Sequence, residues 1–164
     1  MSLLTRLSTA VAACALLLPV ACDVRHLQEL VPQQSTEADV RARFGEPQRV
    51  WEEADGSRTL EYNRQPEGRV NYMVVVDAQG VMTALRQVLV PENFARVQPG
   101  MEPEAVRRLL GQPALRTPYA LKQETEWDWR WMEDGTRPMV FSVTFGADGR
   151  VLRSGSRLEV PISG

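Results

Sequence analysis

The stretch "RRLLGQP" (residues 107–113) ends a run of helically spaced apolar residues with a glycine, one polar residue and a proline. Gly111 can adopt the left-handed conformation that ends a helix, and Pro113 prevents the helix from resuming. The same punctuation occurs earlier in "RARFGEP" (residues 41–47), around Gly45. Two copies of one stop signal predict two short helices at equivalent positions of a repeat.

Both predicted helices begin with a start signal. Thr36 and Asp39 stand three residues apart and fit a capping box, in which each side chain accepts a hydrogen bond from the other residue's backbone N–H. In the second copy Glu102 holds the cap position, and Pro103 follows at the first helical position, where its missing N–H would be unpaired anyway. Apolar residues recur four apart in both helices: Val40, Phe44, Val106 and Leu110. This spacing gives each helix one apolar face.

The segments that follow the two helices also match. Runs rich in Val, Tyr, Trp and Thr alternate with Gly-containing turns, which predicts three or four antiparallel strands after each helix. The hairpin "VVVDAQGVM" (residues 74–82) reappears as "VTFGADGRVL" (residues 143–152). Agreement of cap, stop and hairpin in the same order indicates an internal repeat. The predicted class is α+β, with two tandem units (residues 35–92 and 93–160) in which short helices pack on an antiparallel sheet.

The size of the units bears on how they combine. Each has roughly sixty residues, which buries only a marginal core, so the units should pack on each other or share a sheet. Residues 91–99, "PENFARVQP", are expected to supply a helix or turn at the start of the second unit, with Phe94 and Val97 in weak helical spacing.

The first 21 residues predict a secretory signal peptide and not a part of the fold. They contain one early cation, Arg6, then an apolar stretch, then small residues before Cys22. The apolar stretch is too short to span a bilayer as a stable anchor. Its ending resembles a bacterial lipoprotein signal, with Leu18 one place further from the cysteine than is usual. We therefore expect cleavage before Cys22 and attachment of lipid, including palmitate, to that residue.

The cysteine count favours lipidation. Cys14 lies within the signal, so Cys22 is the sole cysteine of the mature chain and no disulfide framework is expected. Ordinary secretion with Cys22 as a free thiol is the alternative. Residues 22–34 are expected to form a lipidated tether, and His26, the single histidine, is expected to be a tether residue with no catalytic or ligand role.

Composition argues against several functional classes. The formal net charge is −2 and the basic residues are scattered, so no nucleic-acid footprint is expected. The sequence has no Gly-rich phosphate loop and no metal-ligand spacing. No serine has a histidine base within the predicted units. The acidic residues, Glu61 among them, are expected beside turns or on solvated strand faces. We therefore expect no enzyme activity, no cofactor and no metal.

The stretch "RVQPGMEPEAVRRLLGQP" (residues 96–113), then a "WDW" strand, then "VFSVTFGADGRVL" (residues 140–152) resembles the SmpA/OmlA (BamE-type) family of small bacterial lipoproteins. The resemblance covers residues 93–158 well and residues 35–90 more loosely. The family usually has Thr or Ser where Glu102 stands. The matching positions are expected to be structural: Gly100, Met101, Val106, Leu110, Gly111 and Pro113, with Gly45 and Pro47 at the first stop.

The resemblance implies a lipid-anchored scaffold or assembly subunit of the cell envelope. Its partners would be envelope proteins, among them the machinery that assembles β-barrel proteins in the outer membrane. The expected location is the outer membrane, facing the periplasm, and Asp23 beside Cys22 leaves the inner membrane open. The family is similar in fold to β-lactamase inhibitor proteins, which are tandem copies of a two-helix, antiparallel-sheet unit. The alternative is therefore a periplasmic protein-binding or enzyme-inhibitor module that uses a concave sheet.

Three tryptophans suggest a place where a partner is bound. Trp127, Trp129 and Trp131 alternate along one predicted strand, so all three project from one face. One hypothesis places them in the core beneath the second helix, since large aromatic residues usually supply buried area. The other holds that one short helix cannot cover the whole row, which leaves Trp131 at the edge of the sheet. On that hypothesis the candidate partner-binding residues are those whose exposed rings could provide binding energy: Trp131, Trp127, Trp51 and Tyr62.

Overall fold

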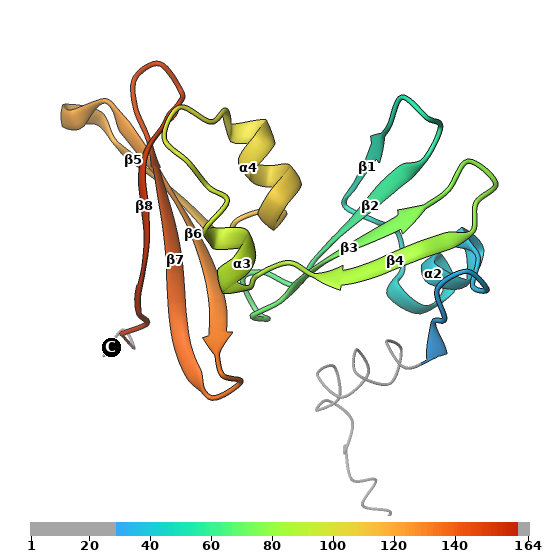
Figure 1. The fold of residues 1–164 in the computed structure, drawn as a ribbon. Helices are drawn as coiled ribbons and strands as arrows, with labels where there is room; N and C mark the ends of the chain where they lie inside the picture. The colour runs from blue at the N-terminus through green and yellow to red at the C-terminus, as the bar shows by residue number, and fades with distance from the viewer. Residues whose placement is uncertain (1–28, 161–164) are drawn as a thin grey trace, which may run out of the picture.

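The structure, a computed structural model, describes residues 29–160. These residues form two four-stranded antiparallel sheets with a few short helices, which is an α+β arrangement (Figure 1). The predicted signal peptide, Cys22, Asp23 and His26 lie outside the described residues. Within residues 29–160, no helix has the length and apolar character needed to cross a membrane.

Each sheet has its strands in sequence order. The first unit contains α2 (Glu37–Phe44), β1 (Arg49–Glu52), β2 (Arg58–Asn63), β3 (Asn71–Val76) and β4 (Met82–Gln87). The second unit contains α3 (Pro91–Phe94), α4 (Pro103–Leu110), β5 (Leu115–Tyr119), the 3-10 turn η1 (Ala120–Lys122), β6 (Glu124–Glu133), β7 (Arg137–Phe145) and β8 (Val151–Leu158).

The predicted ends of α2 and α4 are confirmed. Thr36 and Asp39 form the reciprocal capping box at the start of α2. Gly45 and Gly111 end the two helices with φ of 79° and 75°, a region that glycine enters without steric cost. Glu102 occupies the cap position of α4, but its side chain makes no capping hydrogen bond and instead pairs with Arg150 at 2.9 Å.

The repeat extends to hydrogen bonds that the sequence did not suggest. In the first unit Met82 N–H donates to Ser35 O at 2.8 Å, and in the second Val151 N–H donates to Met101 O at 2.9 Å. Gln48 N–H donates to Glu61 O at 2.9 Å, just as Ala114 N–H donates to Asp128 O at 2.8 Å. These pairs align β1 with β5, β2 with β6 and β4 with β8.

An aromatic side chain fixes each helix stop. Tyr62 Oη donates to the carbonyl of Gly45, and Trp129 Nε1 donates to the carbonyl of Gly111, both at 3.1 Å. Tyr62 and Trp129 therefore occupy equivalent positions. Burial raises the pKa of Tyr62 to about 12, so this hydroxyl stays a donor at neutral pH.

Each unit has its own buried apolar cluster. Val40 and Phe44 of α2 share one cluster with Leu60, Tyr62 and the neighbouring side chains of β3 and β4. The second cluster combines residues of α3, α4 and the loop between them with the inner face of the second sheet. Its members include Phe94, Val97, Val106, Leu110, Trp129, Trp131, Phe141 and Val143.

The predicted tether is too long at its C-terminal end. Leu30 is only 6% exposed and belongs to the core of the first unit. Gln33 N–H donates to Met82 O at 2.8 Å, which fixes the same segment against β4. An apolar side chain left in a solvated linker would forgo this burial, so Leu30 and the residues up to Gln34 belong to the first unit.

The two sheets differ in how their faces are covered. The first sheet has α2 on one face, and α4 lies against its other face (Figure 1). The second sheet has α3 and α4 on its inner face, and none of the helices described packs on its outer face. The order of layers is therefore α2, first sheet, α4, second sheet, with one sheet face left open.

Candidate functional site

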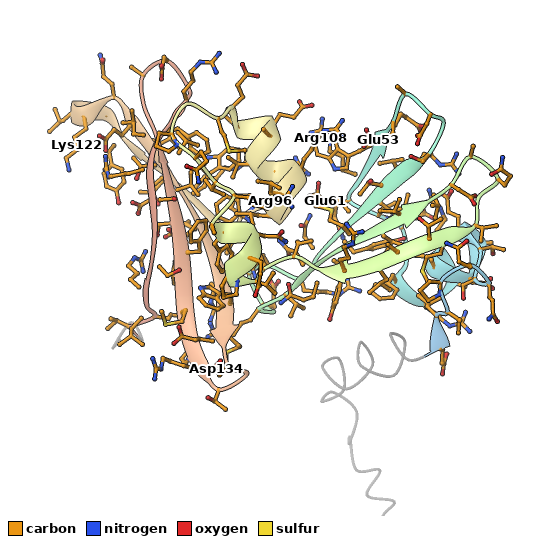
Figure 2. All side chains as sticks on the ribbon, viewed as in Figure 1. Glu53, Glu61, Arg96, Arg108, Lys122 and Asp134 are labelled. Atoms are coloured by element: carbon orange, nitrogen blue, oxygen red, sulfur yellow. The ribbon has the colours of Figure 1, made fainter. Side chains whose placement is uncertain are left out.

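A buried carboxylate joins the two units. Glu61 on β2 is fully buried, and the Nε and Nη2 atoms of Arg107 on α4 lie 3.1–3.2 Å from its carboxylate oxygens. The backbone N–H of Gln112 donates to the same carboxylate at 3.0 Å. Figure 2 shows Glu61 directed from the first sheet toward α4. The expectation that Glu61 lies on a solvated face is wrong, because α4 of the second unit covers it.

The C-terminal end of α4 is held by two asparagines of the first sheet. Asn71, also fully buried, donates through Nδ2 to the carbonyls of Leu110 at 2.8 Å and Gln112 at 3.1 Å. A Cβ atom at Gly111 would stand 2.6 Å from Asn63 Oδ1 and 2.9 Å from Asn71 Nδ2. Glycine is thus required at this stop by close packing as well as by φ.

Trp51 belongs to the same set of contacts between the two units. It is 4% exposed, its Nε1 donates to Glu61 at 3.3 Å, and the guanidinium carbons of Arg49 and Arg108 lie 3.8 and 4.5 Å from its ring centroid. Arg108 also pairs with Glu53 at 2.7 Å (Figure 2). Trp51 is therefore a buried contact between the units and not an exposed partner-binding ring.

A second set of polar contacts links the loop after β2 to the outer face of the second sheet. The side-chain amide of Gln65 bonds to both backbone groups of Arg130, at 2.7 and 3.1 Å. Arg130 pairs with Glu159 at 2.7 Å, and Arg69 of the first unit pairs with the same carboxylate. Burial tends to raise the pKa of Glu159, but the two guanidiniums outweigh it and lower this pKa below the ordinary 4.5.

The open outer face of the second sheet carries a paired charge pattern. Arg153 of β8 reaches across β7 to Glu124 at 2.8 Å, and Arg157 reaches Asp128 at 3.0 Å. Ser142 on the intervening strand donates to Asp128 at 2.6 Å. The hydrogen bond from Arg153 lowers the pKa of Glu124. The carboxylate of Glu124 is thus held ionised at neutral pH, and the side chain of Asp128 is fixed in position by Arg157 and Ser142.

A groove with a volume of 700 Å³ crosses this face. It is lined by Leu115 of β5, Asp128 and Arg130 of β6, Val140 of β7, and Pro66 and Val160 at its two sides. Aligned through the shared hydrogen bonds, Leu115 and Asp128 correspond to Arg49 and Glu61. The groove therefore lies, in the second unit, where α4 is seated on the first.

For the tryptophans on β6, one hypothesis places them in the core and the other leaves Trp131 exposed at the edge of the sheet. Trp131 is 4% exposed and packs edge-on against Phe94 at 4.9 Å, so its predicted exposure is wrong. The reason is α3, which covers the end of the row that α4 does not reach. Trp127 is partly buried beside Phe145 and lies under the guanidinium of Arg116.

Tyr62 is fully buried in the first core, so it offers no exposed ring. Four of the residues expected to be structural make contacts within the second unit. Val106 and Leu110 are fully buried in its core, and Gly100 and Met101 bond to β8 through Val151.

Arginines engage several carboxylates of the described residues. On the open face Glu124 pairs with Arg153 and Asp128 with Arg157, and Glu61 is enclosed between the units. Among residues 29–160 no group of three or more His, Cys, Asp or Glu side chains is arranged to hold a metal ion.

Comparisons with known proteins give only distant likenesses. No family model and no curated protein sequence matches the chain. A DUF4309 family protein (YjgB) from Bacillus subtilis is 19% identical with a TM-score of 0.32, over 80% of this chain and 84% of that one. A β-lactamase-inhibitor-like protein from Streptococcus mutans is 12% identical with a TM-score of 0.33, over 83% of this chain and 95% of that one.

A third structure, an extracellular protein with an SCP domain from Bacillus anthracis, is 12% identical with a TM-score of 0.32, over 92% of this chain and 50% of that one. The second of the three agrees in name with the expected similarity to β-lactamase inhibitor proteins, whereas no match supports the SmpA/OmlA family. TM-scores this low establish neither a common fold nor a common function.

The candidate surface differs from the one predicted because the sequence signal pointed to aromatic residues. The strand residues that line the groove are a leucine, a valine and charged residues, types that are common on any strand. Only the alignment of the two units could have suggested it, since the polar Asn71 of the first unit corresponds to Val140 in the second.

Proposed function

We propose that the protein is a binding module of the cell envelope, attached to a membrane through lipidated Cys22, that holds a partner protein on the outer face of its second sheet. No catalytic step is assigned to it. The support for a binding role comes from the described residues, and the support for the anchor comes from the signal sequence.

The groove at Leu115 and Val140 is the observation on which the binding role rests. On the first sheet the equivalent site is filled by α4, which uses Glu61 and Asn71 as its polar contacts. On the second sheet the site is open and has a volume of 700 Å³. The seating of α4 on the first sheet supports the proposal that the second sheet receives a polypeptide segment at the equivalent place.

Exposed apolar side chains point to the same unit. Seven large apolar residues of the described chain are exposed, and six belong to the second unit: Leu115, Tyr119, Leu121, Leu152, Leu158 and Val160. Only Val31 belongs to the first. Clustered exposed apolar residues mark interaction sites, whereas scattered ones need no explanation.

The anchor would leave this surface accessible. The chain enters the first unit beside α2, and the tip of the β5–β6 hairpin lies at the opposite end of the molecule (Figure 1). A lipid on Cys22 would hold the α2 end near the membrane and direct the hairpin end, with the fully exposed Leu121, away from it.

Two roles are consistent with such a module: a scaffold for envelope assembly, or an inhibitor that occludes an envelope enzyme. Both use the same surface, and the identity of the partner distinguishes them.

Photo-crosslinking in the producing cell tests the proposal. Leu115→p-benzoylphenylalanine and Leu121→p-benzoylphenylalanine should each yield a discrete crosslinked band with another envelope protein. Gln79, in an exposed turn of the first unit, provides the matched control and should yield none. Equal crosslinking from all three positions, or none from any, would show that the second sheet is not a binding surface.

A further inference from the structure

The two edges of the second sheet are unequal. β5 forms one edge and contains Pro118, which has no N–H to offer a pairing strand. β8 forms the other edge and contains no proline from Val151 to Leu158. Seven consecutive residues of β8, 152–158, are exposed, whereas the equivalent strand β4 is mostly half-buried.

The backbone of β8 presents free hydrogen-bonding groups along this edge. Glu159 N–H donates to Pro138 O, so residue 159 and alternate residues before it face β7. The N–H and C=O groups of Ser154, Ser156 and Leu158 therefore point outward, and no hydrogen bond within the described chain uses them. Only Val151, at the start of the strand, is paired on this side, with Gly100 and Met101.

Gly155, in the middle of β8, has no local reason to be glycine. A Cβ atom there would meet nothing within 4 Å, and its φ lies outside the left-handed region. Glycine within a strand weakens it, and it often marks a place where another backbone approaches closely. Residue 155 lies opposite Ser142, so a side chain there would project from the outer face and not from the edge of the strand. Gly155 thus leaves the outer face clear between Arg153 and Arg157.

The side chains on either side of Gly155 indicate what a second chain at this edge carries. Arg153 and Arg157 remain 57% and 53% exposed although each already bonds a carboxylate that is 16% or 13% exposed. A polar hollow of 300 Å³ lies between them, lined also by Glu126, Ser142 and Thr144. Each guanidinium retains donors for a second acceptor. Because Arg153 and Arg157 are four residues apart, the matching acceptors are four residues apart on an extended segment.

We propose that β8 receives an extended segment of a partner protein as a fifth strand, with carboxylates four residues apart that bind Arg153 and Arg157. Main-chain hydrogen bonds to Ser154, Ser156 and Leu158 hold the segment, and the two arginines select it. This inference rests on the proposed binding function and names the class of partner. Arg157 also borders the 700 Å³ groove, so a single partner spans both features.

The test uses the full chain, labelled with ¹⁵N, and the peptide acetyl-VETTTEV-amide. Saturable binding is expected, with slowed hydrogen exchange at the outward amides of Ser154, Ser156 and Leu158. The lysine peptide acetyl-VKTTTKV-amide should bind at least about ten-fold more weakly, because its charges oppose those of the arginines. Equal binding of the two peptides, or no binding of the acidic one, overturns the proposal.

Two variants localise the binding. Ser156→Pro removes one outward N–H on an edge where proline is tolerated, and it should lose peptide binding by about ten-fold or more. Gly155→Val is the matched control, because its side chain projects from the face of the sheet and leaves the edge N–H and C=O groups free. This control should keep peptide binding, with a melting temperature unchanged or higher. Arg153→Ser should weaken binding, whereas Arg150→Ser, at an equally exposed arginine in the preceding turn, should not. Wild-type affinity in Ser156→Pro refutes strand addition.

The outcomes separate this inference from the proposed function. If the acidic peptide does not bind while position 115 still crosslinks to an envelope protein, the partner binds without pairing with β8, and only the strand addition is wrong. If the peptide binds through β8 but Leu115 and Leu121 crosslink to nothing, the strand site stands and the assigned role of the outer face does not.

Discussion

Replacement of Arg107 by methionine should separate the stabilities of the two units. Arg107 is the main cationic partner of Glu61, and methionine keeps its volume and helix propensity while removing the guanidinium. The variant leaves a fully buried carboxylate without its counter-charge. Because this contact joins the two units, its removal should weaken their association and leave the packing of both cores unchanged.

The size of the effect follows from what remains around Glu61. Removal of one partner from a buried ion pair costs about 3–5 kcal/mol. Glu61 would retain hydrogen-bond donors from Trp51, Asn63 and Gln112. The expected loss of free energy of unfolding therefore lies near the lower end of that range, at about 3 kcal/mol. For a chain of this length that corresponds to a fall in melting temperature of roughly 10 °C.

Urea denaturation, followed by tryptophan fluorescence and by circular dichroism, measures the loss. Wild type should unfold in one cooperative transition, and Arg107→Met should lower the midpoint and separate the two probes. Arg108→Met is the matched control on the same helix, because its contact with Glu53 is solvent-exposed and is worth about 1 kcal/mol or less. If Arg107→Met loses no more free energy of unfolding than this control, Glu61 is not an important contact between the two units.

Three further predictions follow from burial, charge and sequence. Trp131→Ala should lower the free energy of unfolding by about 3–5 kcal/mol, as expected for a buried aromatic residue, and thermal melting measures the loss. A melting temperature close to that of wild type would show that Trp131 is not a core residue. The lowered pKa of Glu159 means that its contribution is complete above pH 4.5 and is lost as pH falls through the folded value. Acid should therefore reduce the urea midpoint of wild type more than that of Glu159→Gln, and equal acid losses would contradict the contacts with Arg69 and Arg130. Cys22→Ala should abolish palmitate labelling and release the protein from membranes. Equal labelling of the variant and wild type would show that Cys22 is not the site of lipid attachment.

The local features of the fold were predictable because neighbouring residues determine them. Thr36 with Asp39, the stop at Gly45 and the stop at Gly111 each depend on a few consecutive residues, and all three are present. The hairpins likewise follow from turn residues placed between apolar runs. Such signals are complete within a window of about ten residues, so no knowledge of the tertiary fold is needed.

The errors concern residues whose surroundings come from distant segments. Trp131 is covered by Phe94, which belongs to a helix of only four residues that the sequence marked weakly. Glu61 alternates with apolar neighbours on β2 and so matches a half-solvated strand. Its burial is created by Arg107, 46 residues later in the chain. A single sequence contains the two residues but not their proximity.

Divergence between the two units bears on what the proposed binding face would accept. On the first sheet the site under α4 is polar: Glu61 and Asn71 are both fully buried, Arg107 bonds to Glu61, and Asn71 donates to the carbonyls of Leu110 and Gln112. At the equivalent place on the second sheet, Val140 replaces the asparagine, and the carboxylate of Asp128 is already bonded by Arg157 and Ser142. A segment seated there therefore finds fewer free hydrogen-bonding groups and more apolar contact than α4 does. Its affinity should depend on apolar side chains at the groove, with the charged pairing left to Arg153 and Arg157 at the neighbouring edge.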